Sequence, residues 1–163
     1  MSPIASLLAL TDGYPLRVYP AGHVLLEEGR RGGVLYVLES GTVEILKAGV
    51  AISTVSHPGA VFGEVSSLLN QAPMATVRVT AECRFRVIDE PMAFLRAHPD
   101  AAMHVAMLLA RRLGTVMEYL AELKRKHESR QDHLAMVDEV LASLLNLHAR
   151  PRRVEGMAPT PGD

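Results

Sequence analysis

The segment from residue 58 to residue 68, which reads PGAVFGEVSSL, combines residue types that bind an anion beside a hydroxyl group. Gly63 carries no side chain, so the backbone there can approach a ligand closely. Free backbone N–H groups in such a turn form a concavity that binds anions. The carboxylate of Glu64 can accept hydrogen bonds from a sugar hydroxyl. The pattern therefore favours a ligand that contains a ribose and a phosphate.

Other chemistries find little support in the residue pattern. The sequence contains neither a Gly-x-Ser-x-Gly nucleophile elbow nor a Gly-x-x-x-x-Gly-Lys phosphate loop. Its seven histidines include no His-x-His or His-Glu-x-x-His spacing, and Cys83 is the single cysteine. We therefore expect a non-catalytic protein without a metal, a disulfide or a cofactor.

Charge and hydropathy exclude further classes of protein. The 163 residues include 17 Lys and Arg against 18 Asp and Glu, and this balance argues against a strongly basic nucleic-acid coat protein. The apolar fraction of 48% is sufficient for a buried core. The apolar run at residues 4–10 is short and has no basic residue before it, and no run approaches the roughly 18 apolar residues of a membrane span. We expect a soluble, cytoplasmic protein.

The first 90 residues carry the pattern of an antiparallel β-roll. Short runs rich in Val, Ile and Leu alternate with turns that contain Gly and Pro, which is typical of an all-β roll or barrel. The spacing predicts a jelly-roll-like fold of about eight strands, preceded by a short helix at residues 4–10 that caps the core. The clearest predicted strands are 34–38, 42–46, 51–55, 76–80 and 84–88.

The remainder of the chain carries a helical pattern. A short helix is predicted at 91–98, and Pro99 opens a long helix at about 100–126 with apolar residues in alternating steps of three and four. Such a seam favours a homodimer through 100–126, although it could also pack on the roll of its own chain. We expect a domain at 1–126, an additional helix within 127–150 (about 132–148) and a disordered tail at 151–163. A single helix over 100–148 remains an alternative. The apolar seam positions are Ala106, Leu109, Leu113, Val116, Leu120 and Leu123.

Four segments in order resemble the cyclic nucleotide-binding domain family, which includes the catabolite activator proteins and the regulatory subunits of protein kinase A. They are 33–41, 58–64, 94–99 and 108–113. The resemblance covers about residues 14–125. It implies a β-roll with a long C-terminal helix, and a cyclic nucleotide, cyclic AMP (cAMP) or cyclic GMP (cGMP), as the ligand.

The residues of the family's phosphate-binding cassette match this sequence position by position, except at one position. Gly63 matches the glycine that meets the phosphate, and Glu64 matches the acid that binds the ribose 2′-hydroxyl. The cassette arginine is missing, because either register places Pro73 or Met74 at its position. Arg78 is the nearest substitute cation, unless it is only a solvated strand residue. The ligand-binding residues that we predict are Gly63, Glu64, Val65, Ser66, Pro73, Met74, Ala75, Thr76 and Arg78.

Two functions remain open at this point. The first is a regulatory ligand-binding module that signals through a helical dimer or a partner protein. The second is a dimeric scaffold whose degenerate pocket binds no cyclic nucleotide and whose partner contacts the 132–148 helix. Direct binding to nucleic acid is not expected, because the 40 residues after Leu123 do not contain the pattern of a helix-turn-helix domain.

Overall fold

Two long antiparallel strands form the centre of the computed structural model. β3 (Leu35–Lys47) and β6 (Thr76–Ile88) each have 13 residues and pair over most of their length. β6 alternates buried and exposed residues over 76–80 and 82–85, so one of its faces is directed to the core and the other to solvent. β3 buries five of its residues, Leu35, Val37, Leu38, Val43 and Leu46. The structure describes residues 3–126, 137–140, 142 and 144.

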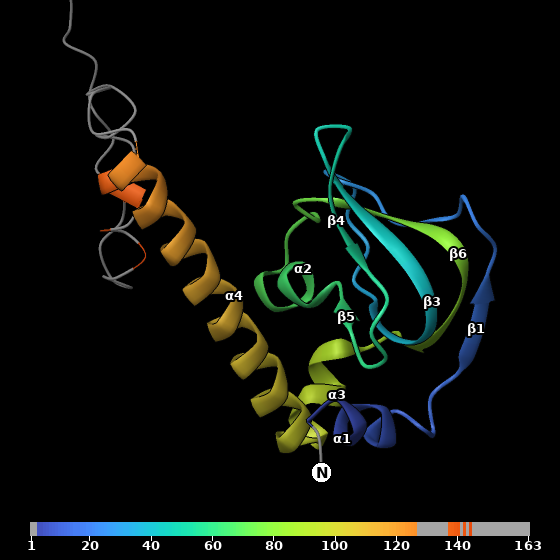
Figure 1. Cartoon of the computed structure of the whole chain (residues 1–163). Coiled ribbons are helices and arrows are strands. Elements are labelled where there is room, and N and C mark those ends of the chain that lie inside the picture. The colour runs from blue at the N-terminus through green and yellow to red at the C-terminus, as the bar shows by residue number, and fades with distance from the viewer. Residues whose placement is uncertain (1–2, 127–136, 141, 143, 145–163) are drawn as a thin grey trace, which may run out of the picture. The chain divides into compact units, whose positions relative to one another are not determined.

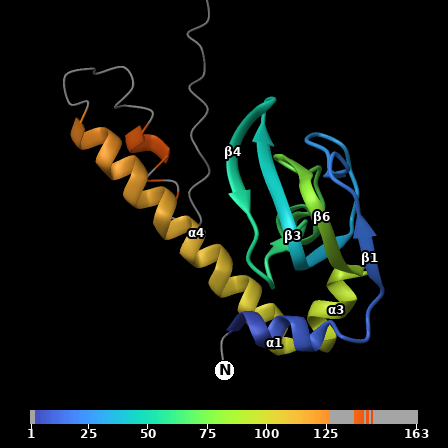
Figure 2. The same cartoon turned by 45° about the vertical axis from the view of Figure 1, so that its right-hand side comes forward.

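The remaining strands complete one antiparallel sheet around this pair. The strand order is β1-β6-β3-β4, while β2 also pairs with β6 and β5 pairs with β3. Figures 1 and 2 both show β4 beside β3 at one edge and β1 beyond β6 at the other. The bounds are β1 (Leu16–Tyr19), β2 (Val24–Leu26), β4 (Val50–Val55) and β5 (Val61–Phe62).

The structure confirms the mixed β-roll and helix architecture, with six strands among the described residues in place of about eight. The two predicted strands 34–38 and 42–46 run as one strand, and so do 76–80 and 84–88. The first join passes through Gly41, which has φ +109°. A Cβ at Gly41 would lie 2.6 Å from Sγ of Cys83, so glycine lets β3 cross β6 closely without interrupting the strand.

Aromatic rings surround Phe85 in the core of the roll. Its side chain is fully buried, and the rings of Tyr19, Tyr36 and Phe62 contact it edge-on at centroid distances of 5.9–6.0 Å. Aliphatic residues of β3 and β6 pack around this cluster, with Leu38, Val43, Val77, Val79 and Val87 among them. The alternating pattern predicted for β6 therefore forms the inner face of the roll.

Helices close one end of the roll. α1 (Pro3–Leu10) buries Leu7, and α3 (Pro91–Ala97) buries Phe94, whose ring contacts that of Tyr14 at 5.1 Å. Figures 1 and 2 both show α1 and α3 together at this end. α4 (Pro99–Lys126) then begins at the predicted proline, which is favoured in the first turn of a helix because it lacks an N–H.

The chain divides into two compact units, residues 1–107 and 108–163. In the second unit the ammonium of Lys124 forms an ion pair with Asp138. Residues 137–140, 142 and 144 are helical, while the rest of the predicted 132–148 helix and the tail at 151–163 lie outside the described residues. Within the described ranges no helix has the length and apolar character that a membrane crossing requires.

Candidate functional site

The predicted cassette begins with a sharp turn into a short helix. α2 (Glu64–Leu69) follows β5 directly, and Gly63 is its N-cap with φ +89° and ψ 6°. A Cβ at Gly63 would lie 2.4 Å from the carbonyl oxygen of Val34 and 3.8 Å from Cδ1 of Leu26. Only glycine fits this position, because both the left-handed backbone and the close approach to Val34 exclude a side chain.

The first turn of α2 is held against the roll. Glu64 is 4% exposed and Ser66 is 8% exposed, which is unusual for polar residues at a helix start. The Gly63 carbonyl accepts hydrogen bonds from the Ser66 hydroxyl at 3.2 Å and from the Ser67 N–H at 3.0 Å. A buried carboxylate next to a glycine turn is an arrangement that can bind a ligand with a hydroxyl group.

The far end of the cassette is fixed by loop 27–33. The Gly29 N–H donates to the Pro73 carbonyl at 3.0 Å, and the Glu28 N–H donates to the Thr76 hydroxyl at 3.0 Å. Pro73 is buried, Ala75 and Thr76 are half-buried, and the Met74 side chain is 56% exposed. The predicted residues 73–76 are therefore anchored by their backbone and by one hydroxyl group.

Arg78 lies on the outer face of β6. It pairs in register with Glu44 of β3, and its Nε donates to Oε1 of Glu44 at 2.7 Å. Its neighbours Val77 and Val79 face the core, so Arg78 points to the opposite side of the sheet. The guanidinium therefore already has a carboxylate partner on the solvent side.

The structure brings two further residues to the cassette that the sequence did not indicate. The Lys47 ammonium donates to the Met74 carbonyl at 2.5 Å and to Oε1 of Glu28 at 2.7 Å. Oε2 of Glu28 accepts from the Ala48 N–H at 2.9 Å. The Lys47 ammonium and the Ala48 N–H both hold the pKa of Glu28 below its ordinary value. No local motif joins these residues, since 27 positions separate Lys47 from Met74.

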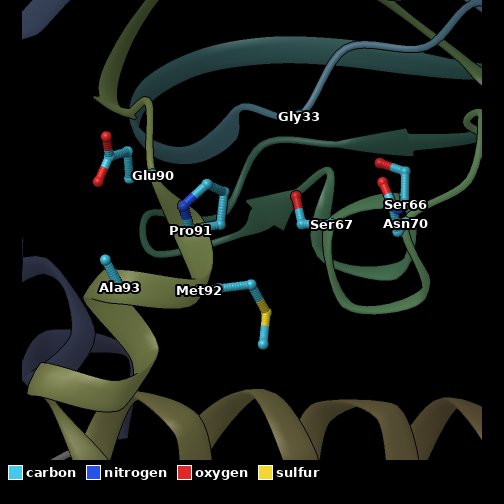
Figure 3. Close-up of a pocket in the computed structure, with 8 residues that line it drawn as sticks. All are labelled: Gly33, Ser66, Ser67, Asn70, Glu90, Pro91, Met92 and Ala93. Atoms are coloured by element: carbon cyan, nitrogen blue, oxygen red, sulfur yellow. The ribbon is translucent and has the colours of Figure 1, made fainter.

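A recess of about 320 Å³ lies between α2 and α3. Figure 3 shows Ser66, Ser67 and Asn70 of the α2 segment on one side of it and Pro91 and Met92 on the other. The buried Ser67 hydroxyl has no hydrogen-bond partner in the described part of the chain. Of the predicted ligand-binding residues, Ser66 lines this recess. The recess therefore has a mixed lining, with polar side chains from the α2 segment and apolar residues from α3.

A second recess of about 350 Å³ lies along β2 and the start of β3. Leu26 and Val34, which lie beside Gly63, line it together with Tyr36, Arg30 and Arg31. Burial raises the pKa of Tyr36, and the phenol of Tyr19 raises it further. Within residues 3–126 and the few described beyond them, no group of three or more His, Cys, Asp or Glu side chains could hold a metal ion.

Comparison with known proteins identifies this arrangement. Residues 16–96 match the family described as the cyclic nucleotide-binding domain. A cGMP-dependent protein kinase of Drosophila melanogaster is 39% identical over 76 residues, which are 47% of this chain and 7% of the relative. A cAMP-dependent protein kinase regulatory subunit of Yarrowia lipolytica is 38% identical over 69 residues, 42% of this chain and 18% of the relative. The chain thus matches a small part of each.

Among solved structures, the catabolite activator protein of Thermus thermophilus superposes with a TM-score of 0.65 at 26% identity. The match covers 76% of this chain and 63% of that chain. Together with the glycine turn and the buried glutamate, these likenesses define the class. The chain belongs to the cyclic nucleotide-binding domain family, as the sequence motifs predicted.

Proposed function

We propose that this chain is a non-catalytic regulatory module that binds a cyclic nucleotide at the cassette formed by residues 63–66 and 73–76. The observation that carries the proposal is the geometry of Gly63 and Glu64. The glycine turn has the left-handed backbone that brings N–H groups close to a phosphate, and the next residue is a buried carboxylate. Two relatives are described as dependent on cGMP and on cAMP, which supports these two ligands as candidates.

The cassette that we propose is atypical in its charge. Neither Pro73 nor Met74 can neutralise a phosphate, and Arg78 is paired with Glu44. One charge-assisted hydrogen bond contributes about 1.5–3 kcal/mol. Its loss without replacement would weaken binding by about one to two orders of magnitude. We therefore expect weaker binding than an arginine-containing cassette would give, unless another cation takes the role.

A thermodynamic cycle on the ribose contact tests the proposed site. Wild-type protein and Glu64→Ala are titrated by calorimetry with cAMP and with 2′-deoxy-cAMP, which lacks the 2′-hydroxyl. If Glu64 accepts from that hydroxyl, its removal weakens binding to the wild type about tenfold or more and barely affects Glu64→Ala. Glu82→Ala, an exposed carboxylate on β6, is the matched control and should behave like the wild type.

If the wild type and Glu64→Ala prefer cAMP over 2′-deoxy-cAMP by the same factor, Glu64 does not contact the ribose hydroxyl and is not part of the site. The variant is compared only after circular dichroism shows that it is folded, because Glu64 is buried.

The alternative function is a dimeric scaffold without a nucleotide. The exposed Met74 side chain at a position where an anion would require a cation favours it. A scaffold would bind neither cAMP nor cGMP at millimolar ligand concentrations. The same calorimetry on folded wild-type protein separates the two functions.

We also propose that α4 carries a homodimer contact. Val116 and Tyr119 are 48% and 63% exposed, and they lie near the partly exposed Leu113 and Leu120 on the helix. A second copy could cover this apolar seam by antiparallel or parallel packing. Val116→Glu should convert the dimer to a monomer in sedimentation-velocity experiments. A wild type that sediments as a monomer at 100 µM would contradict the proposal.

A further inference from the structure

The Lys47 ammonium lies beside the end of the cassette at which the arginine is missing. It contacts the carbonyl of Met74, one of the two positions to which the missing cassette arginine aligns. Its second contact is the Glu28 carboxylate, so the pair is neutral overall. A cation therefore lies against the cassette, although it comes from the end of β3 rather than from the cassette sequence.

Position along the strands distinguishes Lys47 from Arg78. Arg78 pairs in register with Glu44, within the paired part of β3 and β6, and its guanidinium is held by that carboxylate on the solvent side of the sheet. Lys47 is the last residue of β3, and its ammonium reaches the backbone of residue 74 directly. Of these two cations, Lys47 is therefore the one in contact with the cassette.

The chemistry of lysine suits an exchange of partners. An ammonium has three N–H donors, and the contacts with Glu28 and Met74 engage two of them. The four-carbon stem is flexible, and the Lys47 side chain is 54% exposed, so the charge can move by a few ångströms at little cost. We propose that Lys47 supplies the positive charge for the phosphate of the ligand and that Glu28 holds it when the site is empty.

This inference rests on the proposed function. It predicts that substitutions of Lys47 and of Glu28 change the affinity for cAMP in opposite directions. Lys47→Met removes the cation and should weaken cAMP binding about ten- to a hundredfold. Glu28→Gln removes the anion that competes with the phosphate for Lys47, while its amide oxygen can still accept from Ala48. It should therefore tighten cAMP binding. If the ion pair between Lys47 and Glu28 only stabilises loop 27–33, both variants should weaken cAMP binding.

The experiment is calorimetric titration of wild-type protein and these variants with cAMP and with adenosine, which has no phosphate. Lys47→Met should lose affinity for cAMP and leave the affinity for adenosine unchanged, and Lys47→Arg should restore cAMP binding. Lys126→Met is the control, because Lys126 is also an exposed lysine that pairs with a carboxylate, that of Glu122 at 3.4 Å. Its cAMP affinity should match the wild type.

The outcomes separate this inference from the proposed function. A wild type that binds neither cAMP nor cGMP would overturn both. A wild type that binds cAMP, with Lys47→Met binding it equally well, would overturn the inference alone. Equal losses for cAMP and adenosine would also overturn it, because they indicate a structural role. If Lys47→Met does not fold, the sign of the Glu28→Gln effect decides.

Discussion

Replacing Gly63 with alanine should lower the free energy of unfolding for two independent reasons. The backbone at Gly63 has φ +89°, and an L-residue in the left-handed region costs about 1–2 kcal/mol. The added Cβ would also lie 2.4 Å from the Val34 carbonyl oxygen, which belongs to the backbone and cannot rotate away. Overpacking of this kind costs about 1–3 kcal/mol. Together they predict a loss of about 2–5 kcal/mol in the free energy of unfolding.

Urea denaturation followed by circular dichroism measures this loss. The control is Gly32→Ala, because Gly32 is not in the left-handed region and nothing lies within 4 Å of an added Cβ. The control should change the free energy of unfolding by less than about 0.5 kcal/mol. A Gly63→Ala variant that loses less than about 1 kcal/mol would refute the close packing of the cassette turn against Val34.

Three further predictions concern stability and reactivity. Glu28→Gln should unfold more easily than the wild type at pH 7. The lowered pKa of Glu28 means that its stabilisation is fully present above the ordinary value of 4.5 and is lost as the pH falls through the lower pKa of the folded state, so the difference in melting temperature should shrink only below pH 4.5. A difference that does not shrink on acidification would contradict the ion pair with Lys47. Cys83 is fully buried, and burial raises the pKa of its thiol. Ellman's reagent should therefore react with Cys83 only after the protein unfolds. Rapid reaction at about pH 8 without denaturant would contradict the structure. Gly114→Ala should stabilise the exposed middle of α4 by about 0.5–1 kcal/mol in urea melts, whereas a loss would indicate that another surface lies against Gly114.

Local patterns in the sequence predicted the elements that form the site. The alternation in residues 84–88, the proline that begins α4 and the glycine before Glu64 each act through the backbone of a few neighbouring residues, and each lies in the kind of element that was predicted. Such signals do not depend on the rest of the fold, so the sequence alone is sufficient to find them. The predicted break near Gly41 was wrong, because this glycine permits a close crossing of two strands rather than a turn.

The charges around the cassette could not be predicted in the same way. Lys47 and Met74 meet because the end of β3 and the end of the cassette converge, and Glu28 meets Thr76 across 48 positions. Arg78 shares its strand parity with Thr76, which the sequence indicates, but its pairing with Glu44 depends on the register between β3 and β6. These contacts follow from tertiary pairing, which periodicity within one strand does not determine.

Calorimetric titration of folded wild-type protein with cAMP and with cGMP is the most direct test of the central claim, that the cassette binds a cyclic nucleotide. We predict saturable binding of at least one of them, with one site per chain. The affinity should fall as the salt concentration rises, because the phosphate contact is ionic. Absence of heat for both ligands at millimolar concentration, from protein with a cooperative unfolding transition, would contradict it and leave the dimeric scaffold as the function.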